Sequence, residues 1–113
     1  MLPWNIQKRI YQKYNFICQY CGFDGSSFDN WLQMSLDHIL PQSCGGTDEE
    51  NNLIPSCRAC NSFMSAMKFE KGKNIKDILT IKRERVHESR MSNFLNWEKD
   101  VVPYILSKKL PTI

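Results

Sequence analysis

The order of apolar and polar residues predicts one helix followed by two short strands in the first half of the chain. Apolar side chains recur at every fourth position of residues 4–14, which gives that segment one apolar helix face: Ile6, Ile10 and Tyr14. Residues 34–39 alternate partly between apolar and polar, and Pro41 ends this strand because proline cannot donate to a sheet ladder. Residues 52–55 form a second short apolar run, which we interpret as a second strand.

The second half of the chain has the longer periodicity of helices. A helix is expected over about residues 57–68, and its apolar stripe consists of Ala59, Phe63, Ala66 and Met67. A break at residues 71–74 follows, and residues 75–108 indicate one or two further helices, the last kinked or interrupted at Pro103. Two strands among several helices predict the α+β class.

Length and composition limit the number of domains and the class of protein. The chain has 113 residues, which suffices for a single domain over residues 1–113. Its hydrophobic content of 42% and charged content of 24% are those of a folded protein. No apolar run approaches the roughly 18 residues that span a membrane, and the first residues lack the apolar region of a secretory signal. We therefore expect a cytoplasmic protein without a membrane partner.

Charge is distributed unevenly, although the net charge is only +3. Residues 1–23 contain lysine and arginine but no acid, and residues 24–50 contain six acids but no lysine or arginine. Residues 68–90 carry eight basic residues against four acids. An acidic middle between basic ends suits a metal-binding centre flanked by surfaces that bind a polyanion. The alternative is that each basic cluster is an ordinary solvated helix face.

Four of the five cysteines form two Cys-x-x-Cys pairs: Cys18, Cys21, Cys57 and Cys60. Paired thiolates of this spacing are typical zinc ligands, and the alternative is a redox dithiol at either pair. A zinc ion shared by the pairs would close the long loop between them, which contains His38 and Asn52. Metal binding energy would then contribute directly to folding. The fifth cysteine, Cys44, is interpreted as a free thiol without a role.

Oxygen ligands and an imidazole lie inside this loop and next to its end. Asp37 and Asn61 offer the hard oxygen atoms that Mg²⁺ prefers. His38 is the kind of side chain that suits a general base for water, because histidine changes charge near neutral pH. Asn52 has donors and an acceptor with which to hold the backbone of the 39–51 loop. Taken singly, the two asparagines could instead be a turn residue and a helix cap.

The combined pattern resembles the HNH endonuclease family, with its ββα-metal (His-Me finger) motif. The matching motifs are Cys18-x-x-Cys21-Gly22, Asp37-His38, Gly45-Gly46, Asn52-Leu53 and Cys57-Arg-Ala-Cys60-Asn61. The resemblance covers about residues 14–68 and implies two antiparallel strands and a helix that cradle one catalytic metal. We expect this zinc-held core to be flanked by the N-terminal helix and by a C-terminal helical extension over about residues 74–110. The resemblance also implies His38 as general base, Asp37 and Asn61 as ligands of a catalytic Mg²⁺ or Mn²⁺, and Asn52 as the residue that holds the loop.

By this resemblance the expected activity is metal-dependent hydrolysis of phosphodiester bonds in double-stranded DNA, by nicking or double-strand cleavage. Basic side chains would hold the DNA backbone without reading its sequence: Lys8, Arg9, Lys13, Arg58, Lys68, Lys71 and Lys73. Strong sequence specificity would need a homodimer or a larger phage or restriction assembly. The competing hypotheses are a zinc-held nucleic-acid-binding module without catalysis and a protein-interaction adaptor.

Overall fold

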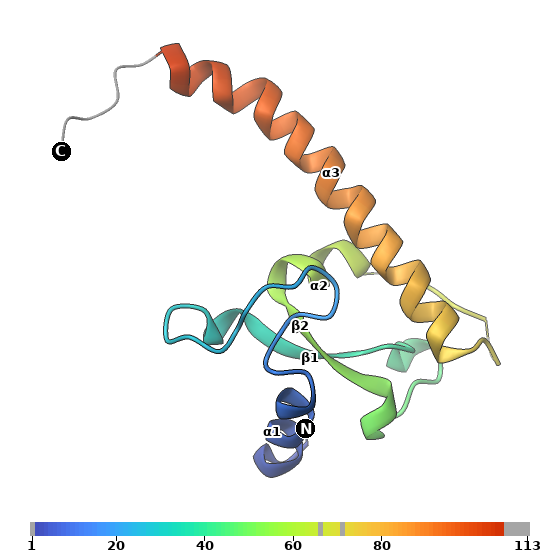
Figure 1. Cartoon of the computed structure of the whole chain (residues 1–113). Helices are drawn as coiled ribbons and strands as arrows, with labels where there is room; N and C mark the ends of the chain where they lie inside the picture. Colours follow the sequence, from blue (N-terminus) through green and yellow to red (C-terminus); the bar gives the residue numbers. More distant parts are fainter. Residues whose placement is uncertain (1, 66, 71, 108–113) are drawn as a thin grey trace.

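The computed structural model describes residues 2–65, 67–70 and 72–107, and this part of the chain has an α+β fold (Figure 1). Its helices and strands are, in chain order, α1 (Trp4–Lys13), β1 (Met34–His38), β2 (Leu53–Cys57), α2 (Arg58–Met64) and α3 (Ile75–Ser107). Three short 3-10 turns lie between them: η1 (Trp31–Gln33), η2 (Gln42–Cys44) and η3 (Glu50–Asn52). Among the described residues, no helix has the length and apolar character needed to cross a membrane.

The two strands pair antiparallel, and α2 follows β2 directly, so that together they form a ββα unit (Figure 1). Met34 lies opposite Cys57 at one end of the sheet, and His38 lies opposite Leu53 at the other. All of β2 is buried, whereas β1 is half-buried throughout. This register places Asp37 and His38 at the end of the sheet where the 39–51 loop leaves β1 and leads to β2.

Helix α3 completes the core and then extends beyond it (Figure 1). Ile78 packs into a core cluster with Ile39 and Ile54, and Val86 packs into a second cluster that contains the paired cysteines. Both apolar residues are fully buried, and they lie eight residues apart on one helix face. The first half of α3 therefore belongs to the same body as the ββα unit.

The structure corrects one boundary expected from sequence, and it decides between one helix and two after residue 74. Helix α2 ends at Met64 and not near residue 68. The hydroxyl groups of Ser62 and Ser65 donate to the carbonyl oxygens of Ala59 and Ser62, and such local bonds compete with helix continuation. Helix α3 is one continuous helix that includes Pro103, so proline does not interrupt it.

Candidate functional site

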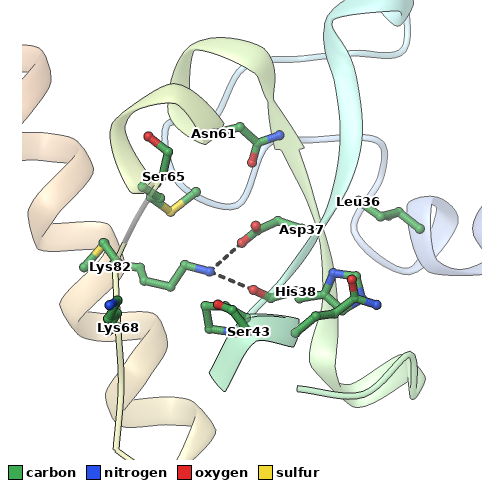
Figure 2. A pocket seen from close by; sticks show the side chains of 12 residues that line it. Leu36, Asp37, His38, Ser43, Asn61, Ser65, Lys68 and Lys82 are labelled. Atoms are coloured by element: carbon green, nitrogen blue, oxygen red, sulfur yellow. Dashed lines mark hydrogen bonds and ion pairs between the residues drawn. The ribbon is translucent and has the colours of Figure 1, made fainter. Parts of the chain in front are cut away.

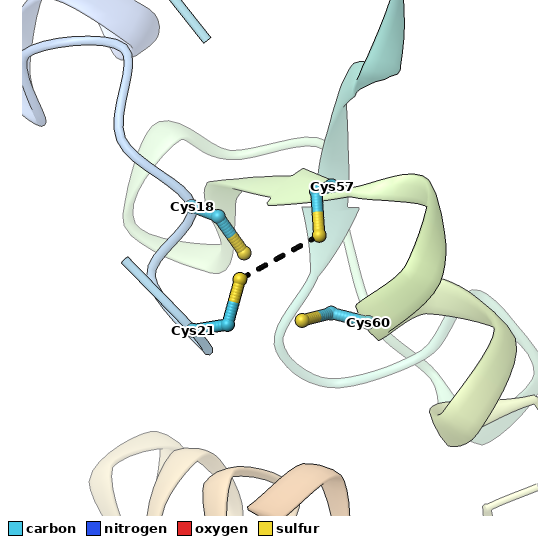
Figure 3. A group of neighbouring side chains, drawn as sticks. All are labelled: Cys18, Cys21, Cys57 and Cys60. Carbon is cyan, nitrogen blue, oxygen red and sulfur yellow. Dashed lines mark hydrogen bonds between the residues drawn. The ribbon is translucent and has the colours of Figure 1, made fainter. Parts of the chain in front are cut away.

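The four paired cysteines converge on one point between two distant segments (Figure 3). Cys18 and Cys21 come from the loop after α1, and Cys57 and Cys60 come from the junction of β2 and α2. Their four Sγ atoms all lie within 4.8 Å of one another. Gly22 closes the first knuckle with a φ of 81°, a conformation that glycine adopts without the steric cost of a side chain.

This arrangement can hold a metal ion and is consistent with a zinc site. The Sγ atoms of Cys21 and Cys57 are 3.7 Å apart, close to the ~3.8 Å edge of a tetrahedron with Zn–S distances of about 2.3 Å. Burial raises the pKa of the Cys60 thiol far above its ordinary value, so a metal must displace the proton to bind. All five cysteines are free thiols, which gives no support to a disulfide at either pair.

Helix α3 is fastened to this cysteine cluster by two arginines. Arg83 Nε donates to the carbonyl oxygen of Gln19, inside the first knuckle, at 2.9 Å. Arg90 lines one cleft with Cys21 and Cys57, and its interaction with Cys21 raises the pKa of its guanidinium. These contacts tie the position of α3 to that of the knuckle.

A cleft of about 350 Å³ opens beside the end of β1 (Figure 2). It is lined by residues of β1, η2, α2, the segment after α2, and α3. Its polar lining includes the predicted site residues Asp37, His38 and Asn61 together with Lys68. The structure thus brings the acid, the histidine and the second asparagine to one cavity, although Asn61 lies 23 or more residues away in the sequence.

The Asp37 carboxylate is held in the cleft by two side chains. Its Oδ2 atom accepts hydrogen bonds from the Tyr20 hydroxyl, at 2.5 Å, and from Lys82 Nζ, at 2.7 Å. Burial and the nearby Asp37 charge raise the pKa of Tyr20 far above its ordinary value, so the phenol stays a donor. The hydrogen bonds given to this side chain within the described residues fall on Oδ2, which leaves Oδ1 for a cation.

His38 points away from Asp37, as successive residues of a strand do. Its Nε2 atom lies 2.7 Å from Oδ1 of Asp48, in the loop that joins the strands. Because an ionised carboxylate can only accept, Nε2 is the donor in this contact, and Nδ1 is the nitrogen that can accept a proton in the neutral ring. The hydrogen bond from His38 also lowers the pKa of Asp48, which keeps that partner ionised.

Asn52 makes the backbone contacts expected of it. Its Oδ1 accepts from the amide of Leu40 at 2.8 Å, and its Nδ2 donates to the carbonyl oxygens of Leu40 and Thr47 at 3.1 and 2.9 Å. The residue is 3% exposed. One buried side chain thus closes the loop that carries Asp48, the partner of His38.

Asn52→Ala is expected to lower the free energy of unfolding by about 3 kcal/mol, since it leaves three loop backbone groups without their partner. Urea denaturation of the metal-loaded protein measures this change. Asn93→Ala is the matched control, because Asn93 donates to Ser89 on the exposed surface of α3 and its loss should cost no more than about 0.5 kcal/mol. Equal costs for the two variants would contradict the loop-closing role.

Asn61 is oriented by two serines that face each other across the sheet. Ser35 and Ser56 are register partners. The Ser56 hydroxyl donates to Asn61 Oδ1 at 2.9 Å, and Asn61 Nδ2 donates to the Ser35 hydroxyl at 2.6 Å. The amide oxygen retains a second lone pair, so this asparagine is held in place and can still act as an oxygen ligand.

Glycine is required at Gly45 and at Gly46 for two different structural reasons. Gly45 adopts a φ of 96°, which favours glycine. A Cβ atom on Gly46 would lie 1.7 Å from the carbonyl oxygen of Leu40, so only glycine fits there. Both positions keep the loop folded back over the end of β1, beside His38.

The predicted DNA-binding residues do not gather at one place. Lys68 lines the cleft, and Arg58 lies on the cysteine side of the molecule. Lys8 and Lys13 are exposed on α1, where Arg9 forms an ion pair with Glu50 that offsets its charge. Lys73 is exposed, and Lys71 lies outside the described residues.

Sequence reasoning missed the groups that hold the predicted residues in place: Tyr20, Ser35, Asp48, Ser56 and Lys82. The burial of Lys82 could have been inferred from the sequence. It lies four residues from both Ile78 and Val86, and this spacing puts all three on one buried helix face. Cys44 was also underestimated, since its Sγ accepts from the amide of Phe69 at 3.4 Å.

Comparison with known families agrees with this geometry. Residues 18–64 match the family model described as HNH endonuclease, and this match spans the cysteine pairs, both strands and α2. No curated protein matches the chain. The match indicates a nuclease or other nucleic-acid-related function for these residues.

Proposed function

We propose that the HNH endonuclease domain of residues 18–64 makes this protein a metal-dependent endonuclease that hydrolyses phosphodiester bonds in DNA. The observation that carries the proposal is the cleft that Asp37, His38 and Asn61 line together. A binding module would need no free carboxylate oxygen beside an imidazole with an unprotonated nitrogen. Catalysis of hydrolysis needs both.

The proposed division of labour follows from the orientation of the side chains. His38 accepts a proton from water at Nδ1 while Asp48 fixes its ring through Nε2. The free oxygen of Asp37 and the amide oxygen of Asn61 are hard donors that suit Mg²⁺ or Mn²⁺. When bound, the cation supplies charge neutralisation at the phosphate and at the departing 3′ oxygen.

The opposed directions of Asp37 and His38 favour this chemistry. In an in-line displacement, the attacking water and the leaving oxygen lie on opposite sides of phosphorus. A base and a cation site that face a phosphate from two sides meet this requirement. His38 also lines a second cleft, with Gln7 and Asp48, on the side away from Asp37. The phosphate would therefore lie across the end of β1.

DNA is the proposed substrate, held through its phosphates and in double-stranded form. Lys68 is the basic residue best placed for a phosphate, because it is exposed and lines the cleft. The helix that carries Asn61 contains only Arg58 as a basic residue, and Arg58 faces the cysteine side.

We propose the whole described chain as one nuclease unit, since α3 shares the core of the ββα unit. The four free thiols of the cysteine cluster favour a reducing compartment such as the cytoplasm.

Supercoiled plasmid tests the proposal. Zinc-loaded protein should convert plasmid to nicked or linear product when Mg²⁺ or Mn²⁺ is supplied and not when it is withheld. The ion is withheld and not chelated, because a chelator would also attack the cysteine site. Retention of DNA with no product under either condition would overturn the nuclease and favour the binding module. No DNA retention at low salt would favour a protein adaptor.

A further inference from the structure

Lys82 is a fully buried lysine that reaches the candidate site from α3. Its side chain is 2% exposed, and it lies between Ile78 and Val86 on the buried helix face. Nζ donates to Asp37 Oδ2 at 2.7 Å and to the carbonyl oxygen of His38 at 2.8 Å (Figure 2). It also donates to the carbonyl oxygen of Ile39 at 3.1 Å.

These contacts exclude a direct role in holding DNA. An ammonium group has three N–H donors, and all three are used by acceptors at the end of β1. Figure 2 shows Lys82 reaching toward Asp37 from α3, with its charge directed at the carboxylate. Its charge therefore acts on Asp37 and on the backbone that carries His38.

We propose that Lys82 is a positioning residue that offsets the charge of Asp37, so that the free protein holds the divalent cation weakly and a DNA phosphate completes the site. This inference rests on the nuclease function proposed above. Binding of the cation and binding of the DNA are then coupled, so that each ligand increases the affinity of the protein for the other.

The charges around the cleft support this assignment. Among the described residues, the charged side chains that line it are Asp37, Lys68 and Lys82, beside His38. Asp37 and Lys82 cancel as an ion pair, and Lys68 adds positive charge. A cation alone thus meets no net negative charge, whereas a phosphate brings the missing negative charge with it.

Lys82→Met tests the proposal because it predicts a gain of binding. Removing one positive charge at short range from Asp37 should tighten Mn²⁺ binding to the DNA-free, zinc-loaded protein by about tenfold or more. Free Mn²⁺ is measured by electron paramagnetic resonance. Structural damage would have the opposite sign, because a displaced carboxylate binds metal less well.

Two further variants make the result specific. Lys76→Met removes an exposed lysine from the same helix and should leave the Mn²⁺ affinity within about twofold. Lys82→Gln removes the charge but keeps donors for the two carbonyl groups, and it should tighten Mn²⁺ binding as Lys82→Met does. A short DNA duplex should raise the Mn²⁺ affinity more in the wild type than in either Lys82 variant.

Unchanged or weaker Mn²⁺ binding in both Lys82 variants would overturn the inference, whatever their cleavage activity. Tighter Mn²⁺ binding supports it even if no variant cleaves plasmid. That second result would count against the nuclease function alone, so the two failures are distinguishable.

Discussion

His38→Ala is expected to lower the rate of plasmid cleavage by about 10²- to 10⁴-fold, the usual contribution of a general base. The imidazole of His38 is the group of the cleft that offers an unprotonated nitrogen, since Asp48 holds the proton on Nε2. Single-turnover nicking at saturating Mg²⁺ measures the chemical step directly. The zinc content and the unfolding midpoint of the variant should match those of the wild type, because the His38 side chain is on the surface side of β1.

Asp48→Asn separates positioning from chemistry at the same imidazole. The amide can still accept from Nε2, but it lacks the carboxylate charge that favours the imidazolium formed when His38 takes a proton. We expect a loss of about tenfold, smaller than that of His38→Ala. Equal cleavage by His38→Ala and the wild type would show that another group removes the proton from water.

Removal of the metal from the cysteine cluster is expected to unfold the domain. Structural zinc contributes about 10–16 kcal/mol of apparent binding free energy, as much as the whole stability of a typical small domain. Cys18, Cys57 and Cys60 are buried in the same core cluster as Met64 and Val86. Loss of helical circular dichroism after treatment with a zinc chelator measures the effect, and added zinc should restore the signal.

Cys60→Ser and Cys44→Ser form a matched pair for this prediction. Cys60 is fully buried in the cluster, and its replacement should abolish stoichiometric zinc binding. Cys44 lies outside the cluster, and its replacement should leave zinc content and fold intact. Acid should weaken zinc binding, because burial raises the pKa of Cys60 and a protonated thiol must lose its proton to bind. A chelated protein that keeps its unfolding midpoint would contradict the structural role.

The sequence predicted the order of elements and the cluster of four cysteines. Local periodicity identified α1, β1 and β2 to within a few residues, because helices and strands repeat their apolar positions over short distances. The two Cys-x-x-Cys pairs predicted one shared metal site, and the structure brings all four sulfur atoms together. Both the apolar periodicity and the cysteine motifs can be read from short stretches of sequence, which is why these features were predictable.

Helix ends were predicted less well, because they depend on competing local bonds. Helix α2 was expected to reach residue 68, but the hydroxyl groups of Ser62 and Ser65 bond to its last turns and it ends at Met64. Periodicity alone could not decide whether residues 75–108 form one helix or two. Packing of Ile78 and Val86 into two core clusters holds its first half as one continuous segment.

The sequence by itself determined which residues we propose to bind metal, accept a proton and close the loop: the four paired cysteines, Asp37, His38, Asn52 and Asn61. Only the tertiary structure decided what holds them. Lys82 meets Asp37 across 45 residues, and Asn61 meets Ser35 across 26. Such partners carry no local pattern, because a hydrogen bond needs only two polar groups that the fold happens to bring within 3 Å. The balance of charge around Asp37 is therefore set by the folded chain, because folding brings Lys82 to it.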